Sequence, residues 1–129
     1  MKILAIIDDE AEMEHIYSMI FEDDIAAGLL EIKFFEDSQT FAEWIPYNHP
    51  DLIVMDINMP NINGIALMRL VRSLGRSIPT YFVSGHDEGQ YRQLFQELGV
   101  TRYLSKPLEF DEVLHTIEED LGISSHGNF

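Results

Sequence analysis

The sequence predicts an α/β fold in which a parallel β-sheet is covered by helices on both faces. Two observations support this prediction. The apolar pattern alternates five times between short continuous runs and stripes with helical spacing, as expected when strands and crossover helices follow one another. Four of the runs end at residues with polar side chains, which suits parallel strands whose carboxyl ends lie along one edge of the sheet. Right-handed crossovers would then place the helices on both faces, giving a doubly wound sheet.

The predicted strands are five short runs rich in apolar residues. Their apolar residues are continuous and not strictly alternating, which is typical of strands buried on both faces. The runs that begin at Lys2 and Leu52 are apolar enough to be central in the sheet. Periodicity alone does not decide whether these two strands are neighbours. The predicted strands cover residues 2–7, 31–35, 52–55, 80–83 and 101–105.

A helical stripe follows each predicted strand, so we expect five helices. Gly75 and Gly99 fall where the third and fourth helices should end, and Ser38 falls where the second should begin. The residues that share a helical face are Met13, Ile16, Tyr17 and Ile20; Phe41, Trp44 and Ile45; Met68, Val71 and Leu74; Tyr91, Leu94, Phe95 and Leu98; and Phe110, Val113, Leu114, Ile117 and Leu121.

Length and composition favour one acidic domain. The chain has 129 residues, of which we expect 1–122 to form the domain and 123–129 a C-terminal tail. A net charge of −15 opposes binding to nucleic acid and to anionic membranes, so neither is an expected partner. The sequence has no cysteine, and its first apolar run is too short for a signal peptide or a membrane span. A cytoplasmic location is therefore the expectation.

Residues that can handle a phosphoryl group stand at the ends of four apolar runs. They are Asp8 and Asp9, Asp56, Ser84 and Lys106. If the first and third strands are neighbours, the three carboxylates meet at one edge of the sheet. Carboxylates packed about 4 Å apart repel each other by roughly 4 kcal/mol per pair at an effective dielectric constant near 20. One lysine would not balance three such charges, so we expect a hard divalent cation, for which Mg²⁺ is the natural choice.

Four segments together resemble the receiver domain of bacterial two-component response regulators. They are IIDDE, MDINMPNINGI, YFVSG and YLSKP, and the similarity extends over the whole chain. The resemblance implies a flavodoxin-like fold with five helices and five parallel strands in the order 2-1-3-4-5. The chain departs from the family's usual pattern after the acidic pair, where AEMEH replaces the frequent Pro-x-x-Arg.

The resemblance also implies a role for each acidic residue of the site. Asp56 matches the phosphoacceptor, and a carboxylate can act as a nucleophile to form an acyl phosphate. Asp9 matches the direct ligand of Mg²⁺, for which Mn²⁺ can substitute, and Asp8 matches a ligand that acts through water. The backbone carbonyl of Asn58 completes the implied ligands from the protein.

Further residues match positions that contact or regulate the phosphoryl group. Lys106 matches the lysine that contacts a phosphoryl oxygen, and the family's Lys-Pro bond is typically cis. Ser84 matches the hydroxyl that moves toward the phosphoryl group, and Tyr103 matches the aromatic residue whose rotamer accompanies that movement. His86 and Asn58 occupy positions that influence the rate of dephosphorylation. An imidazole titrates near neutral pH, so His86 would make that rate depend on pH.

The implied function is a phosphorelay switch and not a metabolic enzyme. The receiver would take its phosphoryl group from a sensor histidine kinase or a histidine phosphotransfer protein. Its output to a downstream protein or to a second copy would use the fourth helix, fifth strand and fifth helix, over residues 90–98, 102–103 and 111–121. Two alternatives remain open: a phosphatase resembling the haloacid dehalogenases, although Asp56-Ile57-Asn58 lacks the second acid of D-x-D, and a receiver-fold interaction module that is never phosphorylated.

Overall fold

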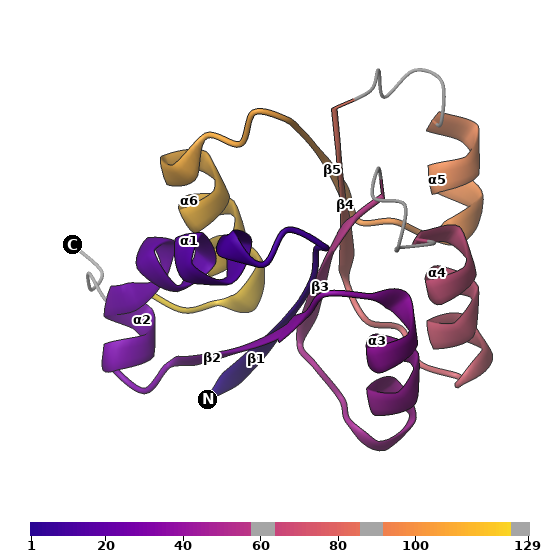
Figure 1. Ribbon diagram of the computed structural model, residues 1–129, viewed down its shortest axis with the longest axis horizontal. Coiled ribbons are helices and arrows are strands. Elements are labelled where there is room, and N and C mark those ends of the chain that lie inside the picture. The colour runs from indigo at the N-terminus through magenta and orange to yellow at the C-terminus, as the bar shows by residue number, and fades with distance from the viewer. Residues whose placement is uncertain (58–63, 86–91, 125–129) are drawn as a thin grey trace.

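The computed structural model describes residues 1–57, 64–85 and 92–124, apart from the side chains of Arg92 and Leu94. Its centre is a five-stranded parallel sheet with the order β2-β1-β3-β4-β5 (Figure 1). The predicted doubly wound fold and strand order are confirmed, including the adjacency of the first and third strands. The strands are β1 (Lys2–Ile7), β2 (Leu30–Phe35), β3 (Leu52–Asp56), β4 (Thr80–Ser84) and β5 (Arg102–Ser105).

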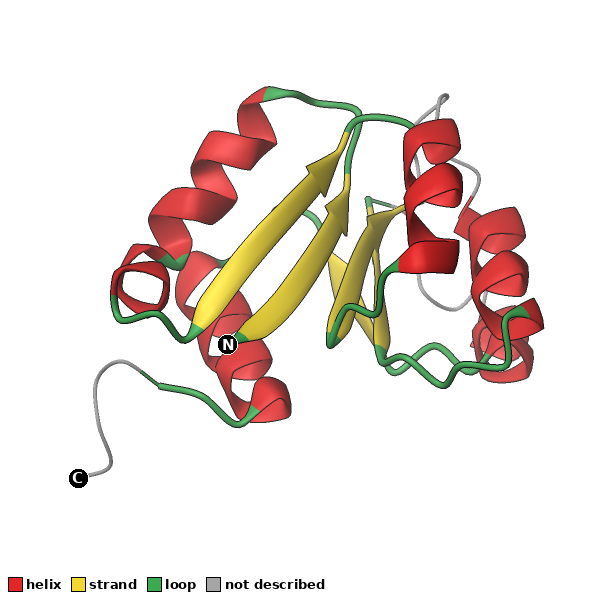
Figure 2. Cartoon of the chain, turned by 90° about the horizontal axis from the view of Figure 1, so that it is seen from below, coloured by secondary structure: helices red, strands yellow, loops and turns green. Residues whose placement is uncertain are grey.

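Helices cover both faces of the sheet, as Figures 1 and 2 show. One face carries α1 (Glu12–Ile20), α2 (Glu22–Ala26) and α6 (Phe110–Leu121). The other carries α3 (Ser38–Trp44), α4 (Gly64–Ser73) and α5 (Arg92–Leu98), and a 3₁₀ turn, η1 (Ile45–Tyr47), follows α3.

The described chain contains six α-helices where the sequence predicted five, because the segment after β1 forms two. The break falls at Phe21, whose backbone leaves the helical region at φ −103° and ψ 18°. Its side chain is fully buried, while α2 starts with the three acids Glu22, Asp23 and Asp24. The bend therefore lets one apolar side chain stay in the core while the acidic start of α2 turns onto a new axis.

The sheet separates the core into two clusters. Successive strand residues point to opposite faces, so neighbours in one strand belong to different clusters. On the α3, α4 and α5 side the strands contribute Ala5, Ile7, Ile53, Met55 and Phe82. On the α1 and α6 side they contribute Leu4, Ile6, Leu52, Val54, Tyr81 and Val83. Burial on both faces explains why these strands read as continuous apolar runs.

Helix ends are mostly where the sequence placed them. Gly75 and Gly99 follow α4 and α5 with φ of 74°, the left-handed conformation that favours glycine after a helix. α3 begins at Ser38, where the sequence predicted the second helix to begin. Asp37 is the N-cap, and its carboxylate accepts a hydrogen bond of 2.7 Å from the backbone N–H of Thr40.

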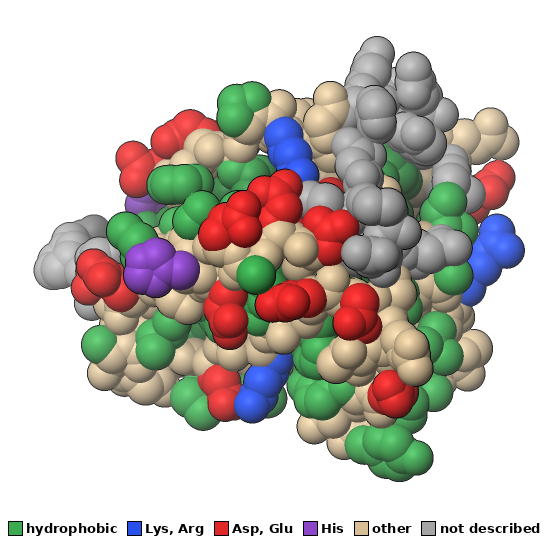
Figure 3. All heavy atoms as spheres, in the orientation of Figure 1, with side chains coloured by type: hydrophobic (Ala, Val, Ile, Leu, Met, Phe, Trp, Pro, Cys, Tyr) green, Lys and Arg blue, Asp and Glu red, His purple; other side chains and the backbone are tan. Residues whose placement is uncertain are grey.

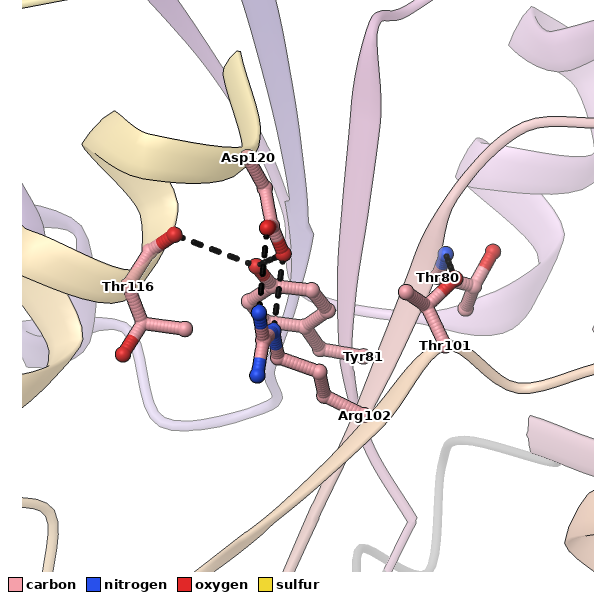
Figure 4. A network of polar contacts seen from close by, with 6 residues as sticks. All are labelled: Thr80, Tyr81, Thr101, Arg102, Thr116 and Asp120. Carbon is pink, nitrogen blue, oxygen red and sulfur yellow. Dashed lines mark hydrogen bonds and ion pairs between the residues drawn. The ribbon is translucent and has the colours of Figure 1, made fainter. Parts of the chain in front are cut away.

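A polar cluster joins β4 and β5 to α6 (Figure 4). The Tyr81 hydroxyl donates to the Asp120 carboxylate, which also accepts hydrogen bonds of 2.8 and 3.1 Å from Arg102. The hydrogen bonds from Arg102 lower the pKa of Asp120. Burial and the contact with this carboxylate raise the pKa of Tyr81. The cluster fixes one end of α6 against the sheet edge.

Within the described ranges, no helix has the length and apolar character needed to cross a lipid bilayer.

Candidate functional site

The strand register brings the predicted site residues to one edge of the sheet. Ile7 pairs with Met55, so Asp8 lies level with Asp56. Asp56 pairs with Val83, which places Ser84 one position further along β4. Ser84 in turn pairs with Ser105, and the residue after Ser105 is Lys106. Segments nearly a hundred residues apart in the sequence therefore meet at the carboxyl ends of β1, β3, β4 and β5.

Backbone hydrogen bonds continue beyond the strands and hold these residues in place. The N–H of Asp8 donates to the carbonyl of Phe35 at 3.0 Å. The N–H of Lys106 donates to the carbonyl of Ser84 at 2.9 Å. Asp8, Asp56, Ser84 and Lys106 thus lie at the strand ends or directly beyond them, which favours a fixed geometry for these four residues.

Asp56 and Lys106 form the central ion pair. The side chain of Asp56 is only 2% exposed, and its Oδ2 contacts the Nζ of Lys106, which is 32% exposed. Burial tends to lower the pKa of Lys106, but the contact with Asp56 and the charges of Asp56, Asp8 and Glu10 raise it overall. Lys106 is therefore a charged ammonium group against a buried carboxylate. The peptide bond between Lys106 and Pro107 is cis.

Asp8 is a second buried carboxyl group beside Asp56. Its residue is 4% exposed, and its Oδ1 accepts a hydrogen bond of 2.9 Å from the N–H of Glu10. Burial raises the pKa of Asp8 to about 6, and the charge of Asp56 adds to this effect, while the Glu10 hydrogen bond and Lys106 oppose it. Tyr17 on α1 feels the same charges, since burial, Asp8 and Asp56 all raise its pKa. The pocket thus concentrates negative charge in a poorly solvated place.

Ser84 and Tyr103 lie on the neighbouring strands β4 and β5, where Tyr103 pairs with Phe82, two residues before Ser84. Ser84 is fully buried at the end of β4. Tyr103 on β5 is half-buried, and its ring stacks on Phe95 of α5 with centroids 5.3 Å apart and an interplanar angle of 26°. Phe95 also makes an edge contact with Phe82. Aromatic packing therefore connects the Tyr103 ring to the core and to α5.

The remaining predicted residues are less closely gathered. Asp9 is half-buried in the loop before α1, and no group of three or more His, Cys, Asp or Glu residues in the described part is arranged to hold a metal ion. The charges of Asp56 and Glu10 both act on Asp8, and of these Asp56 has the larger effect. Asn58 and His86 lie outside the described residues. A pair of buried hard oxygen donors still fits Mg²⁺, which binds through one or two carboxylates and keeps several waters.

A cavity of about 510 Å³ opens beside the ion pair. Its polar wall includes Asp8, Glu10 and Lys106, and its apolar wall includes residues from α1 and from the segment that leads into α6: Met13, Ile16, Pro107, Leu108 and Phe110. The sequence placed Phe110 on the apolar stripe of the last helix, and its residue is 50% exposed. Helical spacing does not show which end of a stripe extends past the sheet edge, so the lining of this cavity was not predicted.

Acidic side chains are spread across the face shown in Figure 3, with few Lys or Arg residues among them. This agrees with the net charge of −15. The charges of Asp56, Asp8 and Glu10 act on Lys106. Such an excess of negative charge favours a divalent cation at the site.

Comparisons with known proteins identify the family and the fold of this chain. The family model described as response regulator receiver domain matches residues 4–118. The chain is 28% identical over 117 residues to the alkaline phosphatase synthesis transcriptional regulatory protein SphR of Synechococcus elongatus, covering 86% of this chain and 45% of SphR. It is 27% identical over 113 residues to the transcriptional regulatory protein FixJ of Bradyrhizobium diazoefficiens, covering 88% of this chain and 53% of FixJ. The chain thus spans about half the length of these curated relatives.

The non-phosphorylated HemR receiver domain from Leptospira biflexa has the same fold, with a TM-score of 0.82 and 19% identity. The match covers 96% of this chain and 97% of that one.

Proposed function

Because this chain belongs to the response regulator receiver domain family, whose members are phosphoacceptor switches of two-component phosphorelays, we propose that its phosphoacceptor is Asp56. The observation that carries this proposal is the contact between the Lys106 ammonium group and the buried Asp56 carboxylate. Asp56 is the acidic residue of the site that pairs with a cation, at the end of a central strand. The phosphoryl donor would be the phosphohistidine of a sensor kinase or phosphotransfer protein.

The reaction uses Asp56 as the nucleophile. One oxygen of its carboxylate forms a bond to phosphorus while the bond between phosphorus and the histidine nitrogen breaks, and the electron pair of that bond stays on the imidazole. Charge spreads over the equatorial phosphoryl oxygens in the transition state, so a positioned ammonium group stabilises it. Lys106 takes this role, because it is already held at the carboxylate that reacts.

Receiver domains bind Mg²⁺ at their acidic pocket, and the residues here fit that ion. Asp9 and Asp56 would hold it directly, with the backbone carbonyl of Asn58, and Asp8 would act through water. The bound ion, or Mn²⁺ in its place, neutralises charge on the phosphoryl oxygens. The raised pKa of Asp8 supports this assignment, since the pocket disfavours a second negative charge when no cation is added.

The switch would act through Ser84 and Tyr103. A phosphoryl group adds a charge of about −1.5 to −2, and only contacts that differ between two conformations convert that charge into a changed surface. The buried Ser84 hydroxyl would move toward the phosphoryl group, and the Tyr103 ring would change its packing against Phe95. The affected surface would be α5, β5 and α6, which are the fourth helix, fifth strand and last helix of the prediction.

The proposed phosphoacceptor function also suggests how partners bind, where the domain ends and where the protein is located. The phosphohistidine would approach through the cavity between α1 and the start of α6, because that cavity borders Asp8 and Lys106.

Residues 1–122 form the receiver and 123–129 a tail, of which 125–129 lie outside the described residues. The output target would be a protein or a second copy, because the negative charge opposes direct contact of this domain with nucleic acid. The absence of cysteine is compatible with the cytoplasm.

His86 and Asn58 would set how long the phosphoryl group lasts. An imidazole near the phosphoryl group changes charge around its usual pKa of about 6.5, so dephosphorylation should vary with pH. A rate that is constant across this range, and the same in His86→Ala, would contradict that role.

Intact mass spectrometry tests the phosphoacceptor. After incubation with acetyl phosphate and Mg²⁺, the wild type should gain a single labile phosphoryl adduct, while Asp56→Asn should gain none. Asp111→Asn is the matched control, because Asp111 is an exposed aspartate in the first turn of α6. An adduct on Asp56→Asn, or none on any variant, would refute the proposal, and the second result would favour an unphosphorylated interaction module.

A turnover assay separates the switch from the phosphatase alternative. Repeated hydrolysis of p-nitrophenyl phosphate, many cycles per protein, would favour a haloacid dehalogenase type of activity. Labelling that stops at one phosphoryl group per chain favours a phosphoacceptor switch that is not a metabolic enzyme.

A further inference from the structure

Two arginines at the C-terminal end of α4 and just beyond it bind the backbone of the helices on either side. α4 lies between α3 and α5 on one face of the sheet (Figure 1). The Nη1 of Arg72 donates a hydrogen bond of 2.9 Å to the carbonyl of Glu97, in the last turn of α5. Arg76 donates hydrogen bonds of 2.7 and 2.9 Å to the carbonyls of Ile45 and Pro46 in η1. Each neighbouring helical segment is therefore held near its carboxyl end.

The carboxyl end of α5 has a carbonyl that needs a donor from elsewhere. The two residues after the helix close it through the backbone: the N–H of Gly99 donates to the carbonyl of Gln96 at 3.2 Å, and that of Val100 donates to the carbonyl of Phe95 at 3.0 Å. This is the Schellman arrangement that ends many helices. Neither bond reaches the carbonyl of Glu97, which is one of the last four carbonyls of the helix and has no acceptor role within it.

Arg72 is closely fitted to this turn. Gly99 has a φ of 74°, and a Cβ built there would lie 3.2 Å from Nη1 and 3.4 Å from Cζ of Arg72. A glycine at this position therefore permits both the left-handed turn and the close approach of the guanidinium group. α5 has no basic residue in its own last turn, so Arg72 brings the positive charge that suits the negative end of a helix.

The rest of α5 is held by aromatic packing. The described helix spans seven residues, and helices shorter than about 12 residues are marginal on their own in water. Phe95 stacks on Tyr103 and makes an edge contact with Phe82. The Arg72 contact is at the other sheet edge from Asp56, because Gly99 lies shortly before the start of β5 and the site lies beyond the strand ends.

We propose that Arg72 is a positioning residue that fixes the C-terminal end of α5 as a pivot. The helix then turns about this end when the packing between Phe95 and Tyr103 changes. The fixed end follows from the contacts of Arg72 alone. The turning motion rests on the proposed function, in which phosphorylation of Asp56 alters the position of Tyr103.

Amide hydrogen exchange of the unphosphorylated full chain, followed by NMR, tests the fixed end. Arg72→Met should speed exchange of the Gly99 and Val100 N–H groups about five- to tenfold, because the helix end loses a charged donor. Rates are compared with the N–H of Ile53, which donates to the carbonyl of Pro79 at 2.9 Å in the sheet and reports on global unfolding.

Two further variants make this measurement specific. Arg72→Lys keeps a charged donor and should restore exchange to within about twofold of wild type. Arg69→Met is the matched control, because it removes the same charge from an exposed position of α4 and should also stay within about twofold. Unchanged exchange in Arg72→Met, an equal rise in Arg69→Met, or a rise that Ile53 shares would overturn the fixed end.

The phosphorylated protein tests the pivot. After incubation with acetyl phosphate and Mg²⁺, with the adduct verified by intact mass, the amide resonance of Phe95 should move while those of Gly99 and Val100 stay in place. In Arg72→Met all three should move. Equal movement of all three in the wild type would refute the pivot. If no adduct forms, the proposed phosphoacceptor is wrong, and the exchange rates of the unphosphorylated chain still decide whether Arg72 holds α5.

Discussion

Replacing Asp8 by asparagine should stabilise the metal-free protein at neutral and higher pH. Asp8 is 4% exposed, and its pKa is raised from 3.8 to about 6 by burial and by the charge of Asp56. Because the folded pKa is raised, the stabilisation from protonated Asp8 is present below pH 3.8 and is lost as the pH rises through about 6. Asparagine keeps an oxygen that can accept the hydrogen bond from the Glu10 N–H, and it never ionises.

The size of the effect follows from the shift in pKa. A change from 3.8 to about 6 corresponds to about 3 kcal/mol at 1.36 kcal/mol per pH unit. Lys106 is partly exposed and water reaches the pocket, so we expect about 2 kcal/mol of added stability for Asp8→Asn at about pH 8. For a domain of this size, that corresponds to a rise in Tm of roughly 6–10 °C.

Thermal and urea unfolding with EDTA measure this difference across the range from about pH 4.5 to about pH 8. The curves of wild type and Asp8→Asn should approach each other at the acid end and separate at the basic end. Glu36→Gln is the control, because Glu36 is exposed just beyond β2 at the same sheet edge, and it should not change the pH dependence. A wild type that is as stable as Asp8→Asn at about pH 8 would refute the argument that the buried carboxylate is costly.

Three further substitutions test other parts of the structure. Lys106→Met should slow phosphorylation by acetyl phosphate about 10²- to 10³-fold, because it removes the positioned cation; a rate within about threefold of wild type in a mass-spectrometric time course would contradict this. Gly64→Ala should destabilise the fold by about 1–3 kcal/mol in urea, since the added Cβ would lie 2.6 Å from Ile57 Cγ2; an unchanged midpoint would show that Ile57 moves freely. Tyr81→Phe should cost about 1 kcal/mol by the same assay, because Asp120 loses a hydroxyl donor and keeps Arg102; no loss would mean that the hydroxyl contributes nothing.

The sheet was predictable because its strands are buried on both faces. Leu52 to Met55 form a continuous apolar run, whereas an amphipathic helix needs apolar residues on one face only. All five residues of β3 are buried. The order of the strands could not be predicted from the apolar pattern. Periodicity did not establish that β1 and β3 are neighbours, and only the resemblance to a known family gave this order. The register then decides which acids meet, since a shift of one residue would move every side chain to the other face.

The parts that the sequence did not show depend on local bends and on burial. The break at Phe21 lies between a helical stripe and an acidic segment, and neither pattern says that the ring of Phe21 will be fully buried at a bend. The burial of Asp24, which is 1% exposed, and of Glu118, which is 6% exposed, was not predicted, because the packing between helices cannot be read from one helix alone. Phe110 had the spacing of a core residue, but it lies where α6 begins beyond the edge of the sheet.

Saturating Mg²⁺ should remove the part of the pH dependence of stability that comes from Asp8. The metal-free fold becomes less stable as the pH rises, because burial and the charge of Asp56 raise the pKa of Asp8 to about 6. A cation bound in the pocket of Asp8 and Asp56 would stabilise the folded state by mass action and offset the repulsion between the two carboxylates. The extra stability of Asp8→Asn over the wild type at about pH 8 should therefore shrink when Mg²⁺ is added. If Mg²⁺ left this difference unchanged, the ion would not bind at this pocket.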